Sequence, residues 1–259
     1  MNDYWVKQDP SNPSFKDLIW SRPENKKLAG KLLIVGGNSY NFSLISTAYS
    51  ATLKAGIGTC RLYLPENLRK SLANLDLDIE FGPSNKSGGF ARSGLSLLLD
   101  LTKWSDGVLL AGDIGKNSET EVMLESFVDK YSGQLVIAND ALSVFKKVDQ
   151  ILNRSNTILI LVFPQLQKVA SASKFANPFT STMGLINFIE TFHLFSIELK
   201  CAIVTYFEEN LIVSYKGKVS STKIKLGNKW QTEVSAKAAV WYIQNPKHIF
   251  EALTSSVLI

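Results

Sequence analysis

The chain has 259 residues, of which 45% are hydrophobic and 20% charged, an ordinary balance for a protein with a sizeable apolar core. Its net charge of +5 comes from 28 Lys and Arg against 23 Asp and Glu, without a dense basic cluster. The sequence therefore gives no sign of a nucleic-acid-binding surface, and no apolar run approaches the length of a membrane span. We expect neither nucleic acid nor membrane as a partner.

Cysteine and histidine are sparse. Cys60 and Cys201 both fall in apolar runs, so we expect buried, reduced thiols without a metal. His193 lies in an apolar helical pattern, and we interpret it as a satisfied helix residue. His248 lies near a helix start, and we interpret it as a surface residue. The first residues, 1–13, contain no apolar signal core, so the expected location is the cytoplasm.

Residues 26–65 contain the most informative pattern. A basic lead-in is followed by the apolar strand Leu32–Val35, the pair Gly36-Gly37 and a small-residue helix that ends at residues 56–58. A second apolar strand, Thr59–Leu64, closes at a proline. Strand, glycine turn, helix and strand form a unit that binds ligands at the carboxyl ends of its strands.

Further apolar strands alternate with helical patterns. Leu95, Leu98 and Leu99 make one helical stripe, and Met123 with Phe127 makes another. Residues 118–121 match a capping box that would open the second of these helices. Strands that are apolar on both faces predict a mostly parallel sheet covered by helices on both sides. The expected strands of this part are 79–81, 107–111, 135–138 and 158–163.

The pattern changes after Pro178. A long helix is expected over 180–199, followed by strands at 201–205, 211–215 and 219–224. Lys216-Gly217-Lys218 predicts a hairpin turn between the last two. Helices over 232–243 and 247–255 would close the chain. We predict a single α/β domain over residues 1–259, a three-layer sandwich that ends in an antiparallel hairpin.

The predicted strand ends carry the candidate site residues. Ligands of open α/β sheets bind outside the carboxyl ends of the strands, so any cleft should be walled by these loops. Asp113 is either a ligand contact or a turn aspartate bonded to its own backbone, and Asp140 is a helix cap, which we favour, or a ligand contact. Residues 82–89 form a mobile lid or, as we favour, an ordinary surface loop. The candidate ligand-binding residues are Gly36, Gly37, Asn38, Ser39, Tyr40, Gly112, Asp113, Gly115, Asn117, Asn139 and Gly227.

Several of these segments resemble the carbohydrate-kinase-like NAD(P)H-hydrate dehydratases, which have the ribokinase-like fold. The similar segments are Arg22-Pro23, Gly36–Tyr40, Ala48–Gly58, Leu64–Glu66, Leu110–Gly115 and Ala138–Leu142. The resemblance is specific in residues up to about Leu142 and covers most of the remaining chain by the order of elements. It implies a ribokinase-like α/β sandwich, assembly into homo-oligomers, and a reaction in which ATP or ADP phosphorylates a hydrated nicotinamide cofactor and phosphate then leaves.

The chemistry of that family depends on motifs that this chain has lost. Counted back from Asn245-Pro246, the family's Gly-Gly-Thr-Gly-Asp turn falls on Leu226–Trp230, so Trp230 occupies the position of the aspartate base. The family's Thr-Pro-His-Pro-Gly-Glu falls on Leu161–Leu166 and keeps one proline, and its Leu-Lys-Gly falls on Thr205–Phe207 without the lysine. We therefore expect a catalytically degenerate homologue that retains at most the binding of a nucleotide or nicotinamide ligand.

Two alternatives remain open. The chain could be an active hydro-lyase or small-molecule kinase in which Asp113 or Asp140 has become the catalytic acid, or a purely structural subunit of an oligomer. The ligands in question are ATP or ADP with Mg, or a molecule of the NADP type.

Overall fold

The computed structural model describes residues 3–258. Its centre is a ten-stranded sheet in the order β1-β10-β9-β8-β7-β6-β5-β2-β3-β4. The strands are β1 Trp5–Gln8, β2 Lys31–Gly36, β3 Thr59–Pro65, β4 Ile79–Gly82, β5 Gly107–Gly112, β6 Gln134–Ala138, β7 Thr157–Leu161, β8 Ala202–Phe207, β9 Asn210–Tyr215 and β10 Lys218–Lys223.

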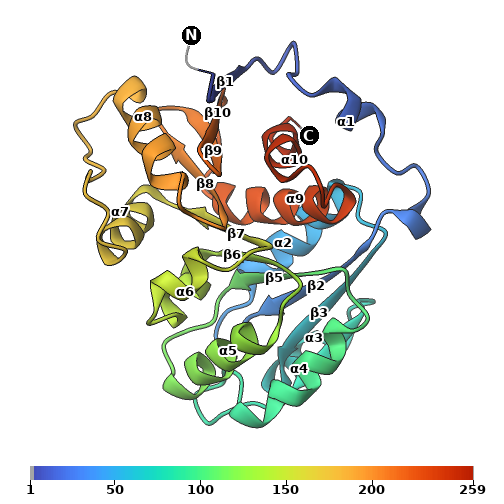
Figure 1. The fold of residues 1–259 in the computed structure, drawn as a ribbon. Helices are drawn as coiled ribbons and strands as arrows, with labels where there is room; N and C mark the ends of the chain where they lie inside the picture. Colours follow the sequence, from blue (N-terminus) through green and yellow to red (C-terminus); the bar gives the residue numbers. More distant parts are fainter. Residues whose placement is uncertain (1–2, 259) are drawn as a thin grey trace.

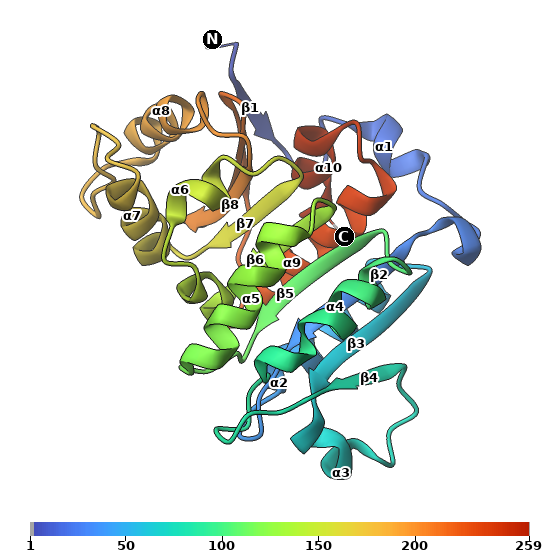
Figure 2. The same ribbon diagram turned by 60° about the horizontal axis from the view of Figure 1, so that its bottom comes forward.

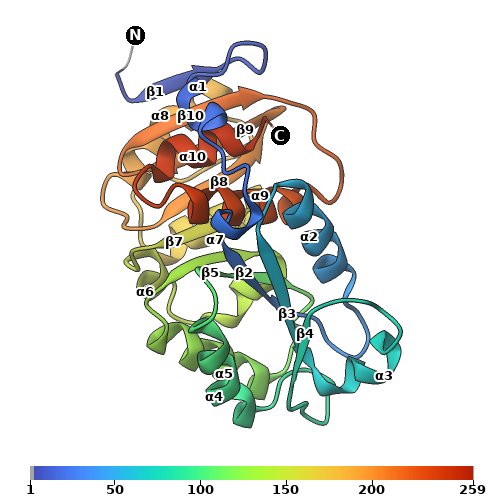
Figure 3. The ribbon, with the colours of Figure 1, turned by 90° about the vertical axis from the view of Figure 1, so that its right-hand side faces the viewer.

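Helices cover both faces of this sheet (Figure 1, Figure 3). The helices are α1 Lys16–Trp20, α2 Ser43–Lys54, α3 Arg69–Leu72, α4 Leu95–Thr102, α5 Ser118–Lys130, α6 Val148–Leu152, α7 Phe163–Ala172, α8 Leu185–Ser196, α9 Trp230–Gln244 and α10 Ile249–Ser256. Four short 3-10 segments, η1 Lys26–Leu28, η2 Glu66–Leu68, η3 Arg92–Gly94 and η4 Asn139–Val144, connect them.

The predicted fold class is confirmed, because the strands from β2 to β8 pair in parallel and only β9 pairs antiparallel with its neighbours. Alternate residues of β2 enter opposite cores. Leu33 and Val35 belong to the core that also holds residues of α4, α5 and α8, whereas Leu32 and Ile34 belong to the core that holds residues of α2, α9 and α10. Figure 2 shows α4 and α5 lying over β5, β2 and β3 on the first of these faces.

The predicted hairpin is also confirmed. Tyr215 pairs with Lys218, so two residues form the turn between β9 and β10. Both turn residues have positive φ, 49° at Lys216 and 79° at Gly217, as a two-residue turn that matches the strand twist requires.

Some boundaries in the prediction were wrong. The strand expected to reach Phe163 ends at Leu161, because Phe163 and Pro164 already open α7. The helix expected from residue 180 begins at Leu185. The expected capping box at 118–121 is wrong as well: Asn117 is the N-cap of α5, and its side chain accepts hydrogen bonds from Glu119 N and Thr120 N.

The N-terminal strand β1 was not foreseen. It pairs in parallel with β10 at one edge of the sheet. The expectations for the cysteines and histidines agree with the structure. Cys60 and Cys201 are buried and free, His193 of α8 is hydrogen-bonded to Gly217 O, and His248 precedes α10 on the surface. Among residues 3–258, no helix is long and apolar enough to cross a membrane.

Candidate functional site

The loops that follow β2, β5 and β6 meet at one edge of the sheet. Gly37 N donates to Gly112 O at 3.0 Å, and a Cβ on Gly36 would lie 2.3 Å from the same oxygen. The glycine at position 36 is therefore required by the close approach of two strand exits. Asp113 and Asn139 have φ values of 55° and 56°, which are unusual for residues with a side chain and gather here at the predicted site.

Asp113 holds the first turn of α2. Its two carboxylate oxygens accept hydrogen bonds from Leu44 N at 2.8 Å and Asn41 Nδ2 at 2.9 Å, so the interpretation as an aspartate bonded to its own turn was wrong. The side chain is 7% exposed. Burial raises the pKa of Asp113, the bond from Leu44 N opposes that rise, and the nearby charge of Asp140 adds to it.

Asp140 holds the loop after β5. Its Oδ2 accepts hydrogen bonds from Ile114 N at 3.0 Å and Gly115 N at 3.2 Å. The expectation that it caps its own helix was wrong, because the N-cap of η4 is Ala138. The other oxygen, Oδ1, is buried without a hydrogen-bond partner, and a Cβ on Gly112 would lie 2.8 Å from it.

The loop after β2 is fixed by its neighbours. Asn38 Nδ2 donates to Asp113 O at 2.6 Å, so Tyr40 and Asp113 lie at the same end of the sheet, as expected. Ser39 N donates to Gly88 O at 2.9 Å and joins this loop to residues 82–89. The Tyr40 side chain is 88% exposed.

Residues 82–89 are organised around the buried Asn85. Its Nδ2 donates to Phe90 O, Asn117 Oδ1 and Thr120 Oγ1 at 3.0, 2.9 and 3.0 Å, and its Oδ1 accepts from two backbone N–H groups of the loop. This arrangement supports the interpretation as a surface loop over that of a lid.

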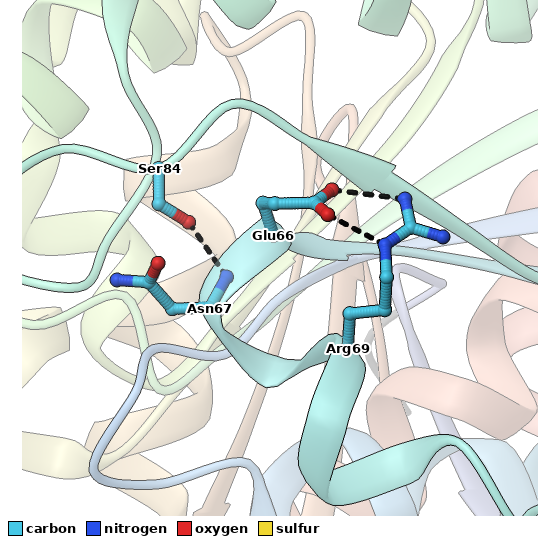
Figure 4. A network of polar contacts seen from close by, with 4 residues as sticks. All are labelled: Glu66, Asn67, Arg69 and Ser84. Atoms are coloured by element: carbon cyan, nitrogen blue, oxygen red, sulfur yellow. Dashed lines mark hydrogen bonds and ion pairs between the residues drawn. The ribbon is translucent and has the colours of Figure 1, made fainter.

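The loop is also joined to the exit of β3. Ser84 Oγ accepts a hydrogen bond from Asn67 N at 2.9 Å, beside the ion pair that Arg69 forms with Glu66 (Figure 4). The guanidinium of Arg69 lies 4.4 Å from the centroid of the Phe81 ring. Polar contacts thus join the end of β3 to the loop 82–89.

The start of α9 is occupied by aromatic and amide side chains. Trp230 is the first residue of α9 and its ring packs against Tyr206 with centroids 5.7 Å apart. The backbone N–H of Trp230 donates to Gly227 O, and the backbone N–H groups of Thr232 and Glu233 donate to Lys229 O. The N–H donors of residues 230, 232 and 233 are therefore already engaged within the chain.

Two amide side chains fill the space between α9 and the strand exits. Gln231 Nε2 donates to Ile160 O at 2.6 Å and to Gln165 Oε1 at 2.7 Å. Gln165 Nε2 in turn donates to Asn139 O at 2.8 Å, and Asn139 Nδ2 donates to Thr232 Oγ1 at 3.0 Å. We call these four residues the amide cluster: Asn139, Gln165, Gln231 and Thr232.

The structure thus brings all the predicted loops together at the carboxyl ends of the strands. Asn117 is the N-cap of α5, and Gly227 O accepts a hydrogen bond from the first residue of α9. Sequence reasoning missed Asn41, Asn85, Gln165, Gln231 and Thr232. The one local signal was Gln165, three residues after Val162, where its Oε1 accepts from Val162 N at 3.1 Å. The other contacts join residues far apart in the sequence.

The polar side chains at this end of the sheet are bonded to one another and to the backbone, and they do not form a metal site. The amide cluster occupies the helix start, and Asp113 uses both carboxylate oxygens in internal bonds. In the part of the chain that the structure describes, no group of three or more His, Cys, Asp or Glu side chains could hold a metal ion. Five surface hollows have volumes of about 190 to 750 Å³, and none of these five is lined by Asp113, Asp140 or the predicted glycines.

Comparison with solved structures defines the fold as ribokinase-like. A ribokinase-like superfamily protein of Enterococcus faecalis superposes with a TM-score of 0.72 at 14% identity, covering 97% of this chain and 85% of that one. The ADP/ATP-dependent NAD(P)H-hydrate dehydratase of Bacillus subtilis, co-crystallised with ATP and Mg²⁺, gives 0.66 at 10% identity, covering 94% and 84%.

Within this fold, the chain resembles the NAD(P)H-hydrate dehydratase family. It is 25% identical over 164 residues, 61% of this chain, to a bifunctional NAD(P)H-hydrate repair enzyme of Dictyoglomus turgidum. The match spans about a third of that enzyme, 32% of its length. No family model matches the chain.

Proposed function

We propose that the protein is a non-catalytic relative of the NAD(P)H-hydrate dehydratases that binds a nucleotide or nicotinamide-type ligand at the carboxyl edge of its sheet. The non-catalytic part rests on the start of α9, where Trp230 occupies the position of the family's base and the amide cluster lies beside it. The binding part rests on the fold, on the repair enzyme to which the chain is similar, and on the strained strand exits.

The physical reason is the lack of a base at position 230 and the engagement of three N–H donors at the start of α9. Dehydration through phosphorylation needs a group that accepts the substrate proton and N–H donors that hold the developing phosphate charge. Indole has only a donor N–H near neutral pH. The first-turn N–H groups of Trp230, Thr232 and Glu233 already donate to backbone oxygens.

A turnover assay tests the loss of catalysis. Purified protein with ATP or ADP and hydrated NADH should show no recovery of the absorbance of the reduced nicotinamide. An active dehydratase run in parallel is the control. Robust turnover would refute the proposal.

A binding experiment tests the retained ligand. NADP⁺, ADP and ATP are titrated into ¹⁵N-labelled protein, and the amide signals of Gly36, Gly37 and Gly115 should move most. Thermal shift follows the same ligands, since a ligand at a hundredfold its Kd stabilises the fold by about 2.7 kcal/mol. Unmoved signals at all three glycines with every ligand would remove the binding part of the proposal.

One observation favours the relocated acid as a second candidate. The raised pKa of Asp113 is a feature of catalytic acids, although both its oxygens are engaged. If turnover is found, an Asp113→Asn variant decides, since unchanged turnover would exclude Asp113. Asp140→Asn is tested in the same way.

Assembly into an oligomer and a cytoplasmic location are further proposals. If neither turnover nor binding is found, a structural subunit is favoured, and sedimentation velocity should then reveal a homo-oligomer. A cytoplasmic location can be checked with a fluorescent fusion.

A further inference from the structure

Helices α2 and α9 run side by side (Figure 1, Figure 3). Residues of both helices line a groove between them. Ala48 and Ala51 of α2 and Ala236 and Ala239 of α9 belong to one core, and such small side chains allow two helices to pack closely. The groove has a volume of about 380 Å³. It does not include the strand exits of the proposed ligand site.

Each helix presents one polar stripe to this groove. On α2 the stripe consists of Ser46, Thr47, Ser50 and Lys54, and on the α9 side of Lys229, Glu233 and Lys237. Residues three, four, seven and eight apart lie on one face of a helix, so both stripes run along the groove. Lys229 Nζ lies 3.4 Å from Thr47 Oγ1 and connects the two walls.

The charge in the groove is unbalanced. Three lysines, Lys54, Lys229 and Lys237, face a single carboxylate, Glu233. In the described part of the chain, none of the three lysines forms an ion pair within 4.0 Å, although Glu233 and Lys237 are four residues apart on the same helix. Burial lowers the pKa of Lys237, Glu233 opposes this, and Lys54 lowers it further, so an added anion would relieve this group.

We propose that the α2–α9 groove binds a small linear polyanion, through the phosphates of an oligophosphate or of a nucleoside di- or triphosphate. Lys229 and Lys237 are eight positions apart, roughly 12 Å along a helix, so a single phosphate reaches only one end of the stripe. A chain of two or three phosphates lies along it and contacts lysines at both ends, while the hydroxyls of Ser46 and Ser50 donate from the opposite wall. This inference does not depend on the proposed function, because no lining residue belongs to the loops after β2, β5 or β6, although Lys229 and Glu233 lie at the start of α9.

Calorimetric titration with tripolyphosphate at about 0.15 M salt tests the inference, a concentration at which the Debye length is ~8 Å and remote charges are screened. Lys237→Gln should weaken binding by roughly five- to tenfold, as expected for the loss of one charge-assisted contact. Glu233→Gln should strengthen binding, because it removes the only carboxylate of the groove. Lys168→Gln is the matched control: Lys168 is an exposed lysine of α7, on the opposite face of the sheet, and its loss should leave the affinity unchanged.

Two further measurements fix the location and the source of the phosphates. Amide signals of α2 and α9 should move with tripolyphosphate and with ATP, and orthophosphate should bind more weakly than either. Equal binding of ATP and tripolyphosphate assigns the site to the phosphates alone, and tighter binding of ATP assigns it to a nucleotide.

Three results would overturn the inference: no binding of tripolyphosphate, equal weakening by Lys168→Gln, or signals that move only at the strand exits. If Lys237→Gln does not fold, the exposed Lys54→Gln replaces it with the same expected direction. Movement of the strand-exit glycines with NADP⁺ is a separate result that concerns only the proposed function.

Discussion

At the scale of single residues, Trp230 and Asp113 both have structural contacts at the proposed ligand site. Trp230 opens α9 and packs on Tyr206, and Asp113 fixes the first turn of α2. Both side chains stabilise the edge of the sheet at which the family's reaction would take place. Each role can be tested by one substitution.

Restoring an aspartate at position 230 should not restore catalysis. Trp230→Asp leaves the amide cluster in place, so we expect no detectable turnover of hydrated NADH. The unfolding free energy, from urea denaturation, should fall by about 1–2 kcal/mol because part of a large apolar side chain is lost from its contact. Trp20→Asp is the control, since Trp20 is 83% exposed, and should change stability little. Rapid turnover by Trp230→Asp would show that the amide cluster does not block the site.

The raised pKa of Asp113 predicts a pH effect of definite sign. The folded protein holds this proton more tightly than the unfolded chain, whose carboxyl has its ordinary pKa of 3.8. The stabilising contribution of the proton is therefore complete below pH 3.8 and is lost as the pH rises through the higher, folded pKa. The difference in unfolding free energy between the wild type and Asp113→Asn should fall as the pH rises through this window. A difference that grows with rising pH would contradict the raised pKa.

At the scale of elements, the structure joins loops to helix starts through buried amides. Asn85 bonds the loop 82–89 to the start of α5, where Asn117 is the N-cap. Ser39 N donates to Gly88 O and so joins the loop after β2 to the loop 82–89. The loop after β2, the loop 82–89 and the start of α5 should therefore lose order together.

Asn85→Ala removes the centre of this arrangement. The loss leaves two loop N–H groups without their acceptor, whereas Phe90 O keeps its bond from Thr120 Oγ1. We therefore expect the unfolding free energy to fall by about 2–3 kcal/mol. Limited proteolysis should then cleave within residues 82–89. Lys86→Ala, an exposed neighbour, should change neither measurement. Rapid cleavage of the wild-type loop would instead favour a mobile lid.

At the scale of the whole molecule, the N-terminal segment closes one edge of the sheet against the C-terminal helix. β1 pairs with β10, and the buried Gln8 donates from Nε2 to Thr222 Oγ1 at 3.1 Å and to Thr254 O of α10 at 2.7 Å. A strand edge without such a cover is a site for pairing with other chains.

Gln8→Ala should weaken this closure. We expect a loss of about 1–3 kcal/mol in unfolding free energy, because two buried acceptors lose their donor. Size-exclusion chromatography should also show more self-association, as β1 detaches from β10. The control is Asn12→Ala in the same segment, where the side chain is exposed. An unchanged stability of Gln8→Ala would mean that β1 contributes little to the sheet.

The amino-acid sequence by itself determined the order of the elements and most of the sheet. Apolar strands such as Leu32–Val35 and 107–111 can be predicted because both their faces are buried. The turn at Lys216-Gly217 can be predicted because few residues adopt its backbone angles. The short edge strand β1 was missed because only Gln8 of its four residues is buried, so it lacks the apolar run of an inner strand.

Only the tertiary structure decided what the polar residues do. Asp113, Asp140 and Gln231 find partners 69, 26 and 71 positions away in the chain, and no local pattern encodes such pairs. The sequence could place these side chains at the ends of strands, because parallel strands end at one edge. Whether a carboxylate there faces a ligand or holds a helix start depends on which N–H groups the folded chain brings within reach, and that is set by the packing of α2 and α9 on the sheet.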